Sequence, residues 1–306
     1  MVKIKVPATS ANLGPGYDSF GLALNLFNEY TFSKRNDNKG LEINIVANND
    51  SEIDLKNEDN LILNTVKYLE NIYREKILTT NLTIQAKINY PLNRGLGSSA
   101  NAIIGTLAGL NEFFNLNFKE SQLLEYALEL EGHPDNIVPA FKGGFTISQI
   151  ENNFLQYEKF LLSEKLNFLL FIPDFFIKTK QARQVISSKI KVKDASQNIA
   201  NASLLTAGFI KNDLSLIKKG SKDYIHQAKR LSLNKKLESF FLDLENKIDI
   251  PYFLSGSGPT IIFLSKEDLA KLKEIIIKKA DKYEIVNYLI ETNTNNQGII
   301  ISKDGD

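Results

Sequence analysis

The chain has 306 residues, 43% of them hydrophobic, and carries 37 basic against 36 acidic side chains, which gives a formal net charge of +1. This balance excludes a general attraction to nucleic acid or to an anionic membrane surface. The absence of cysteine excludes disulfides, cysteine-ligated zinc and thiol nucleophiles, and a count of 2 histidines argues against a histidine-rich metal site. The first residues do not resemble a signal peptide and no run of about eighteen apolar residues occurs, so we expect a cytoplasmic protein that binds neither membrane nor nucleic acid.

Alternating apolar residues predict strands and an apolar spacing of about 3.6 residues predicts helices, so we expect a chain that mixes both. Strands are expected at 2–6, 29–33, 41–47, 82–89, 142–148, 166–173, 250–254, 261–264, 285–291 and 298–302. Helices are expected at 60–73, 98–114, 119–131, 176–183, 197–219, 223–230 and 266–282. The polar stretch 151–165 is the expected boundary between two domains, at 1–160 and 161–306.

A turn-rich stretch, 8–19, follows the first expected strand and contains two glycines and a proline as breakers. Within it, Asn12 and Asp18 are candidates for hydrogen bonds to a polar ligand. The alternative is that both side chains only close Asx turns. Farther along, Asp59 or Asn60 is a candidate N-cap for the helix that follows.

The stretch Pro91–Asn101 reads Pro-Leu-Asn-Arg-Gly-Leu-Gly-Ser-Ser-Ala-Asn and connects an expected strand to an expected helix. Glycine lets a backbone approach a ligand closely, and the first N–H groups of a helix lack intrahelical partners. Because the helix dipole also favours an anion there, the stretch is suited to bind phosphate. The simpler interpretation is a capped helix, with Ser98 or Ser99 as the N-cap and glycines that only shape the turn.

Two known nucleotide motifs fit this stretch poorly. Gly95 to Ala100 matches the Gly-x-Gly-x-x-Ala form of the dinucleotide fingerprint, but that fold needs a strand after the helix, whereas 119–131 has helical spacing. The Walker A motif is absent, because Gly-Lys-Ser or Gly-Lys-Thr occurs nowhere in the chain. A phosphate loop of another kind and a simple capped helix both remain open.

Polar side chains gather at the end of the expected helix 119–131. Glu131, His133, Asp135 and Asn136 fall within six positions, around a glycine and a proline that stop the helix. Such a cluster offers a carboxylate for Mg²⁺ and polar groups for a substrate hydroxyl. The alternative is a capped helix end whose polar residues face solvent.

Three further stretches carry polar or turn-forming residues. Thr179 and Arg183 lie near an expected helix start, and the mixed polar stretch 223–230 ends in Arg230. A solvated face is the default interpretation for basic residues in such helices. The stretch 255–260, Ser-Gly-Ser-Gly-Pro-Thr, is compatible with a hairpin and equally with a loop packed under a ligand.

Three loops, at 7–19, 91–100 and 254–260, together resemble the three motifs of the GHMP kinase superfamily, named for galactose, homoserine, mevalonate and phosphomevalonate kinases. The first loop and the segment from Glu131 to Ile137 resemble the homoserine kinase family in particular, and the likeness spans nearly the whole chain. The resemblance implies an α+β, two-domain GHMP kinase fold. Its N-terminal domain would be a ribosomal-S5-domain-2-like α/β domain, and its C-terminal domain ferredoxin-like α+β.

The resemblance further implies an ATP-dependent kinase that uses Mg²⁺ and phosphorylates the side-chain hydroxyl of L-homoserine, giving O-phospho-L-homoserine in threonine biosynthesis. It also implies a homodimer. The implied ATP contacts are Asn60, Pro91, Leu92, Asn93, Arg94, Gly95, Leu96, Gly97, Ser98, Ser99, Ala100 and Asn101. The implied metal contacts are Ser98, Ser99 and Glu131, and the implied substrate contacts are Asn12, Asp18, His133, Asn136, Thr179, Arg183, Arg230 and Gly256.

The implied catalytic residues are Glu131, Asn136 and Asp135. Asp135 is the carboxylate that could act as a base, whereas the resemblance favours an Asn136 that orients the hydroxyl without a dedicated base. Two features depart from the family pattern. Tyr17 stands where phenylalanine is more familiar, and the usual His-Glu-Pro-Tyr-Arg is here His-Gln-Ala-Lys-Arg, which keeps the spacing of Arg230.

Overall fold

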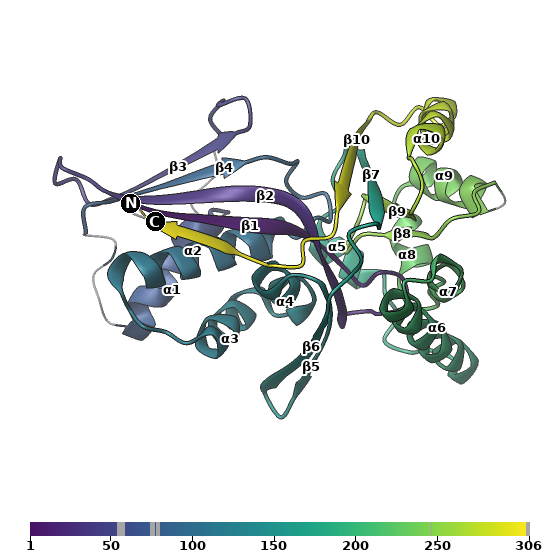
Figure 1. Cartoon of the computed structure of the whole chain (residues 1–306), viewed down its shortest axis with the longest axis horizontal. Coiled ribbons are helices and arrows are strands. Elements are labelled where there is room, and N and C mark those ends of the chain that lie inside the picture. Colours follow the sequence, from purple (N-terminus) through teal and green to yellow (C-terminus); the bar gives the residue numbers. More distant parts are fainter. Residues whose placement is uncertain (54–58, 74–76, 78–79, 246, 304–306) are drawn as a thin grey trace.

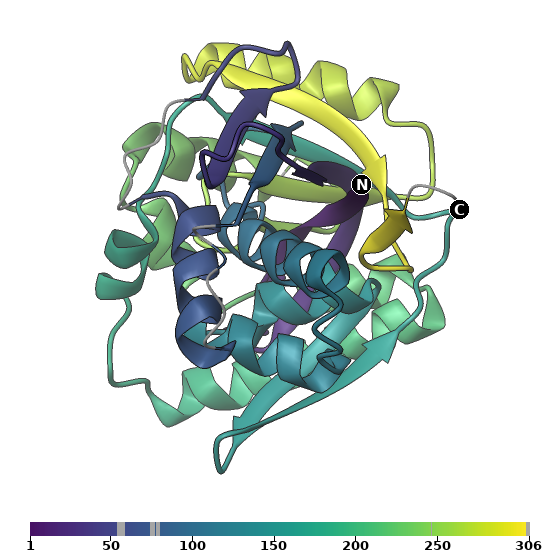
Figure 2. The same cartoon turned by 90° about the vertical axis from the view of Figure 1, so that its left-hand side faces the viewer.

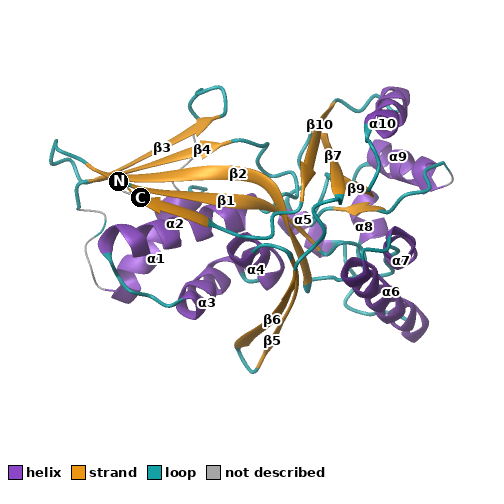
Figure 3. Ribbon diagram, in the orientation of Figure 1, coloured by secondary structure: helices purple, strands orange, loops and turns teal. Residues whose placement is uncertain are grey.

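The computed structural model describes residues 1–53, 59–73, 77, 80–245 and 247–303. Its strands are β1 Val2–Ala11, β2 Phe20–Lys34, β3 Leu41–Ala47, β4 Leu82–Ile88, β5 Phe145–Glu151, β6 Phe154–Phe160, β7 Asn167–Pro173, β8 Tyr252–Leu254, β9 Ile261–Ser265, β10 Asn287–Asn293 and β11 Ile300–Lys303. Its helices are α1 Leu61–Tyr73, α2 Ser98–Phe114, α3 Glu120–Glu131, α4 Pro134–Lys142, α5 Thr179–Gln184, α6 Val192–Lys211, α7 Leu214–Gly220, α8 Gln227–Leu231, α9 Lys235–Glu245 and α10 Ala270–Lys282. Figure 3 shows helices and strands mixed along the chain, so the expected α+β class is confirmed.

The strands form two sheets that lie one beyond the other along the molecule (Figure 1). The first sheet has the order β11-β1-β2-β4-β3, with the hairpin of β5 and β6 attached to β2. The second sheet has the order β10-β7-β9-β8. Helices α1 to α4 cover one face of the first sheet, and the β5–β6 hairpin projects from the body (Figure 1 and Figure 2).

Strands β1 and β2 connect the first sheet to the region between the two sheets. At its start β1 alternates, with buried Val2, Ile4 and Val6 between partly exposed lysines, as a strand with one solvated face does. A register shift between Pro7 and Ala8 interrupts its pairing with β2, and such irregularities bend a strand. Beyond the shift, β1 is buried on both faces because elements of both sheets pack around it.

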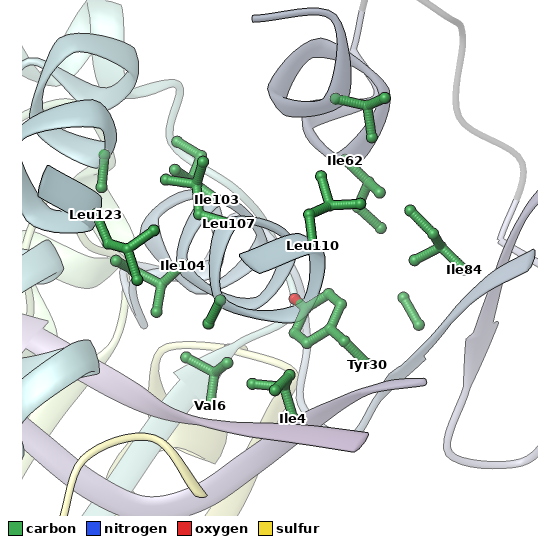
Figure 4. Packing of buried hydrophobic residues seen from close by; sticks show 14 of the residues in the cluster. Ile4, Val6, Tyr30, Ile62, Ile84, Ile103, Ile104, Leu107, Leu110 and Leu123 are labelled. Carbon is green, nitrogen blue, oxygen red and sulfur yellow. The ribbon is translucent and has the colours of Figure 1, made fainter. Parts of the chain in front are cut away.

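Helix α2 is the central helix of the cover on the first sheet. Its apolar residues pack over Ile4, Val6 and Tyr30 of the sheet (Figure 4). A Cβ on Gly105 or Gly109 of this helix would come within 2.4 Å or 1.9 Å of an aromatic ring of β2. The two glycines therefore allow a close approach, and each fully buried leucine or isoleucine here contributes about 1.5–3 kcal/mol. This packing sets the position of the N-terminus of α2.

The second sheet is apolar on both faces. One face of β7 packs Phe171 against Phe240 of α9, with ring centroids 4.6 Å apart. The other face belongs to a cluster with Phe168, Phe145 and Phe209, which joins the second sheet to β5 and α6. A strand that is buried on both faces has a continuous run of apolar residues. The apolar run at 166–173 therefore predicted β7 well.

Some elements differ from the sequence expectations. Helix α4 was not expected, because Pro134 was interpreted only as a stop, whereas it occupies the first turn of a new helix, where its missing N–H costs nothing. Helix α9 and strand β6 were not expected either. The expected helix 223–230 shortens to α8, since the Asp223 carboxylate accepts the backbone N–H groups of Ile225, His226 and Gln227.

The expected division of the chain at 1–160 and 161–306 stays a prediction. The polar stretch 151–165 contains β6, which pairs with β5 in the first sheet, and the second sheet starts with β7. From the far end of the chain, β11 returns to the first sheet and pairs with β1. Among the described residues, none of the helices combines the length and apolar character needed to cross a bilayer.

Candidate active site

A cavity of about 620 Å³, here called the central cavity, lies where the two sheets meet. It collects side chains from segments far apart in the sequence. Of the residues expected at a site, those lining it are Asn12, Asp18, Asn93, Gly95, Gly97, Ser98, Ser99, Glu131, His133, Asp135, Asn136, Thr179, Arg183, Arg230 and Gly256. The expected residues that do not line it are Asn60, Pro91, Leu92, Arg94, Leu96, Ala100 and Asn101.

The N-terminus of α2 opens into this cavity. Gly97 is the N-cap, with a left-handed φ of 66°, and no side chain caps the helix. The expectation that Ser98 or Ser99 would be the N-cap is therefore wrong, because both already belong to the helix. The first N–H groups of a helix of 17 residues remain available for an anion, and the helix dipole adds to the attraction.

Asn101 does not line the central cavity, and its expected role as an ATP contact stays a prediction. Its side chain is fully buried and its amide donates to the carbonyl groups of Val6 and Pro7 at 2.8 and 3.0 Å. Its amide oxygen accepts hydrogen bonds from Asn28 and from the Tyr30 hydroxyl. All hydrogen-bonding groups of this amide are used to join α2 to the first sheet.

Other residues of the loop also have structural partners. Leu96 and Ala100 are buried in the two apolar clusters. Arg94 donates to the carbonyl of Pro173 at 3.1 Å and to that of Leu92 at 3.2 Å, so its guanidinium fastens the loop to the end of β7. This side chain is not aimed at a phosphate in the central cavity.

Asn60, Pro91 and Leu92 lie outside the central cavity. The Asn60 side-chain oxygen accepts the backbone N–H of Leu63 at 3.1 Å, which makes Asn60 the cap of α1. Pro91 and Leu92 instead line a second cavity of about 460 Å³, together with apolar residues such as Ile88. The stretch 91–101, here called the phosphate loop after its expected role, thus contributes residues to two cavities.

The loop at 255–260 forms hydrogen bonds with the phosphate loop. The Ser255 hydroxyl donates to the carbonyl of Gly95 at 2.6 Å and shares a hydrogen bond with the Ser10 hydroxyl at 2.9 Å. The backbone N–H of Thr260 donates to the carbonyl of Arg94 at 3.3 Å. The segment connects the antiparallel strands β8 and β9, so the hairpin interpretation is confirmed, and packing under a ligand stays a prediction.

Oxygen atoms suited to a divalent cation face the cavity beside this loop. The Ser99 hydroxyl donates to a carboxylate oxygen of Glu131, and the Ser98 hydroxyl accepts the backbone N–H of Asn93 at 3.4 Å. Burial raises the pKa of Glu131, while Ser99 and Arg183 oppose this. The described residues contain no cluster of three or more acidic, histidine or cysteine ligands. One carboxylate with hydroxyls still fits Mg²⁺, which takes one or two carboxylates and completes its shell with phosphate and water.

Helices α3 and α4 meet at the cavity. Gly132 ends α3 and His133 is the N-cap of α4, so Asp135 and Asn136 lie in the first turn of α4. Asp135 is 4% exposed and burial raises its pKa to about 7. Its carboxylate accepts a long hydrogen bond of 3.5 Å from the side-chain amide of Asn136. Of the cluster, only Asp135 is buried, and Glu131, His133 and Asn136 are partly exposed between the end of α3 and the start of α4.

Thr9 is a cavity neighbour that sequence reasoning missed. It is fully buried on β1, and its hydroxyl donates to the side-chain oxygen of Asn136 at 2.7 Å. The two residues are 127 positions apart in the chain. The only local signal was a hydroxyl residue in the first loop motif, and nothing near it in sequence indicates its partner.

The two candidate side chains of the first loop, Asn12 and Asp18, have different partners. Asn12 is 2% exposed, and its side-chain oxygen accepts the backbone N–H of Asp18 at 2.9 Å, so it closes the loop. The Asp18 carboxylate pairs with the Arg183 guanidinium through two hydrogen bonds of 3.0 Å. Arg183 also donates to the Tyr17 hydroxyl at 3.2 Å, and His133 lies 3.8 Å from Asp18. Opposite charges thus stand together at one side of the cavity.

Arg230 reaches the cavity from α8 and is held by a buried network. Its guanidinium donates to the carbonyls of Ala182 at 3.2 Å and Gly256 at 2.7 Å. It also contacts Nδ1 of His226 at 3.3 Å, while Nε2 of His226 lies 2.8 Å from the carbonyl of Gly14. Because arginine only donates and a carbonyl only accepts, His226 carries its proton on Nε2. Burial lowers the pKa of His226 to about 4, which keeps the ring neutral.

Comparison with known proteins identifies the family of the chain. Residues 60–144, which hold the phosphate loop and helices α1 to α4, match the GHMP kinases N terminal domain. The chain is 38% identical to a homoserine kinase of Halothermothrix orenii over 98% of this chain and 96% of that one. It is 36% identical to a homoserine kinase of Clostridium botulinum over 99% of each chain.

Solved structures of homoserine kinases are also similar to this chain. The crystal structure of homoserine kinase from Cytophaga hutchinsonii is 27% identical and superposes with a TM-score of 0.83, covering 98% of this chain and 97% of that one. A crystal structure of mevalonate kinase, 20% identical with a TM-score of 0.66, shares the fold. Likeness in sequence and fold thus spans nearly the full length of the chain, and the chain belongs to the homoserine kinase family of the GHMP kinases.

Proposed function

We propose that this chain transfers the γ-phosphoryl group of ATP to the side-chain hydroxyl of L-homoserine, giving O-phospho-L-homoserine, as a step of threonine biosynthesis. One observation carries the proposal. The central cavity has an uncapped helix N-terminus at one side and the oppositely charged Asp18 and Arg183 at the other. The first suits phosphates and the second suits the ammonium and carboxylate of an amino acid.

The nucleotide phosphates would lie against the N-terminus of α2, on the backbone N–H groups that follow Gly97. The purine base would occupy the cavity of about 460 Å³ beyond Pro91, whose lining includes Ile53 and Tyr90. An apolar pocket with few polar groups suits a flat aromatic base. Asn60 remains a proposed contact on this side, and its amide nitrogen is the group to test because its oxygen caps α1.

Glu131, Ser98 and Ser99 are the residues that would hold Mg²⁺. When bound, Mg²⁺ would offset the negative charge of the phosphates during transfer. The Ser99–Glu131 hydrogen bond holds both oxygen donors on the same side of the cavity. Because Glu131 is the carboxylate of this group, its negative charge is the main protein contribution to cation binding.

The amino acid would replace a contact that the protein already makes. Its ammonium group would take the place of the Arg183 guanidinium at the Asp18 carboxylate, and its carboxylate would take the place of Asp18 at Arg183. Arg230 would add charge to the carboxylate side, with its orientation set by Gly256 and His226. A ligand with only one of the two charges would leave one partner unpaired, which disfavours it.

In the reaction, the hydroxyl oxygen of homoserine would form the new bond to the γ-phosphorus. The bond from that phosphorus to the β–γ bridging oxygen would break, and ADP would leave with the electron pair. The hydroxyl proton would pass to an oxygen of the transferred phosphoryl group, with Asn136 holding the hydroxyl in place. In the competing route, the Asp135 carboxylate would take the proton. A loose transition state needs mainly positioning and charge neutralisation, which favours the first route.

The test is ADP release measured with homoserine, mevalonate and galactose side by side, each with ATP and Mg²⁺. The proposal expects rapid ADP release with homoserine and a value of kcat/KM lower by at least about a thousandfold for the other two. Mevalonate lacks the ammonium group and galactose lacks both charges, so each would leave Asp18 without a partner. Comparable turnover of either compound would overturn the assignment of substrate. The expected homodimer stays a prediction that sedimentation of the same protein can check.

A further inference from the structure

We infer that Thr9 is a positioning residue, which fixes the direction of the Asn136 side-chain amide so that Asn136 presents an N–H group to the acceptor hydroxyl. The inference rests on the proposed function, because it assigns a role within the same reaction. Thr9 lies on β1 and does not line the central cavity, so it acts through Asn136.

The hydrogen bond between the two side chains has a defined direction. The Thr9 hydroxyl donates to Oδ1 of Asn136 at 2.7 Å, so the amide oxygen faces a residue that does not line the central cavity. Nδ2 of Asn136 then faces Oδ1 of Asp135 at 3.5 Å. With the amide reversed, its oxygen would face the Asp135 oxygen at this distance, and two acceptors repel each other unless a proton lies between them. Asp135 therefore favours this orientation, and the Thr9 hydroxyl, which can donate or accept, holds the amide in it through the hydrogen bond to Oδ1.

Thr9 is itself held against the phosphate loop. Its backbone N–H donates to the carbonyl of Leu96 at 3.2 Å. A Cβ built on Gly97 would come within 1.9 Å of the Thr9 hydroxyl oxygen and within 2.9 Å of Oδ1 of Asn136. The N-cap of α2 thus packs directly on the Thr9–Asn136 hydrogen bond, and only glycine leaves the space for it.

This packing places the acceptor site at a set distance from the phosphate site. Gly97 begins the helix that would hold the phosphates, and Asn136 would hold the hydroxyl that attacks. An N–H donated to the hydroxyl oxygen leaves the hydroxyl proton and a lone pair free for the transfer. An amide oxygen turned toward the cavity would instead bind that proton and direct the lone pairs away. Small losses of alignment reduce the rate of such reactions strongly.

The test compares Thr9→Val with the wild-type protein in steady-state assays with ATP and homoserine. Valine has the shape of threonine without the hydroxyl, so we expect kcat to fall by about ten- to a hundredfold while both KM values change by less than about threefold. Thr9→Ser keeps the hydroxyl and is expected to restore most of kcat. If the valine variant does not fold, Thr9→Ala, which only removes atoms, takes its place in the comparison.

A double-mutant cycle separates positioning from a general loss of structure. Asn136→Ala alone lowers kcat, and adding Thr9→Val to it is expected to have no further effect, because Thr9 acts only through Asn136. Independent, multiplying losses would overturn the inference, as would an unchanged kcat in Thr9→Val. Absence of ADP release by the wild-type protein with homoserine would overturn the proposed function and this inference with it. Normal wild-type turnover together with an unchanged kcat in Thr9→Val would overturn this inference but leave the proposed function standing.

Discussion

Asp18 and Arg183 face each other at the edge of the central cavity and share two hydrogen bonds, each 3.0 Å long. They lie 165 positions apart in the chain, one in the loop after β1 and the other on α5. In the proposed function, the amino acid substrate exchanges this internal ion pair for one with each of its own charged groups. The exchange explains why both charges of the substrate are needed.

Arg183→Ala is expected to raise the KM for homoserine about ten- to a hundredfold and to leave the KM for ATP nearly unchanged. The reason is the loss of charge-assisted hydrogen bonds to the substrate carboxylate, each worth about 1.5–3 kcal/mol. Lys189→Ala, at an exposed lysine after the same helix, is the matched control and should change neither value. Equal increases in both KM values would remove Arg183 from the amino-acid pocket.

Glu131→Gln is expected to raise the Mg²⁺ concentration needed for half-maximal activity and to lower kcat. The amide keeps the size and the oxygen of the side chain but lacks the charge that attracts a hard cation. A Mg²⁺ titration of ADP release measures both effects. Glu125→Gln, on an exposed position of the same helix, serves as the control. An unchanged Mg²⁺ dependence in Glu131→Gln would show that another group holds the cation.

Asp135→Asn distinguishes the two routes for the hydroxyl proton. Burial raises the pKa of Asp135 to about 7, so its basic form predominates only above that pH. If the phosphoryl group itself takes the proton, as we propose, kcat of the asparagine variant stays within about tenfold of wild type. A base would instead give a fall of about a hundredfold or more, and wild-type kcat would decline as the pH drops below about 7.

Asn101→Ala is expected to lower stability by about 3 kcal/mol without raising the KM for ATP. Removing the amide leaves the buried groups of Asn28 and Tyr30 and the carbonyls of Val6 and Pro7 short of partners. Unsatisfied buried groups cost about 1–3 kcal/mol each, and some relax. Urea unfolding and ATP kinetics on the same preparation check both statements. A KM for ATP that rises while stability is kept would contradict the buried, structural role.

Loss of stability in acid is expected to depend on His226. Its pKa is lowered by burial from 6.5 to about 4 in the folded protein. Between pH 6.5 and about 4 the unfolded chain binds a proton that the folded one does not, so this contribution to stability is complete above pH 6.5 and is lost as the pH falls to about 4. The loss is about 3 kcal/mol at most.

His226→Gln isolates this effect, because glutamine can also donate to the Gly14 carbonyl and accept from Arg230 but does not titrate. The free energy of unfolding, measured in urea at pH 8 and pH 5, should fall less for the variant than for wild type. The same decrease in both proteins would show that other groups cause the acid sensitivity.

Much of the fold could be predicted from local pattern. The expected helices 98–114 and 119–131 agree with α2 and α3 to within one residue, because apolar spacing and glycine breakers act locally. The apolar run 166–173 likewise predicted β7. Helix α4 was missed because proline can end one helix or begin the next, and neighbours along the chain do not distinguish the two cases.

The candidate site was predicted less completely. Spacing and residue type singled out the stretch 91–101 and the cluster around Glu131, and both contribute residues to the central cavity, but they could not tell which side chains of a loop face inward. Asn101 and Arg94 belong to the same stretch, 91–101, as Gly97, yet their side chains bond to the first sheet and to the end of β7. Burial of a side chain depends on what packs over it, which neighbouring residues do not specify.

The sequence by itself determined where several helices and turns lie, and that a glycine-rich turn precedes the helix at 98–114. These properties arise from backbone sterics and from groups only a few residues apart. Only the tertiary structure decided that Thr9 hydrogen-bonds to Asn136 from 127 positions away and that Asp18 pairs with Arg183 from 165 positions away. The physical reason is that such contacts exist only when packing of the two sheets and of α2 brings distant backbones together.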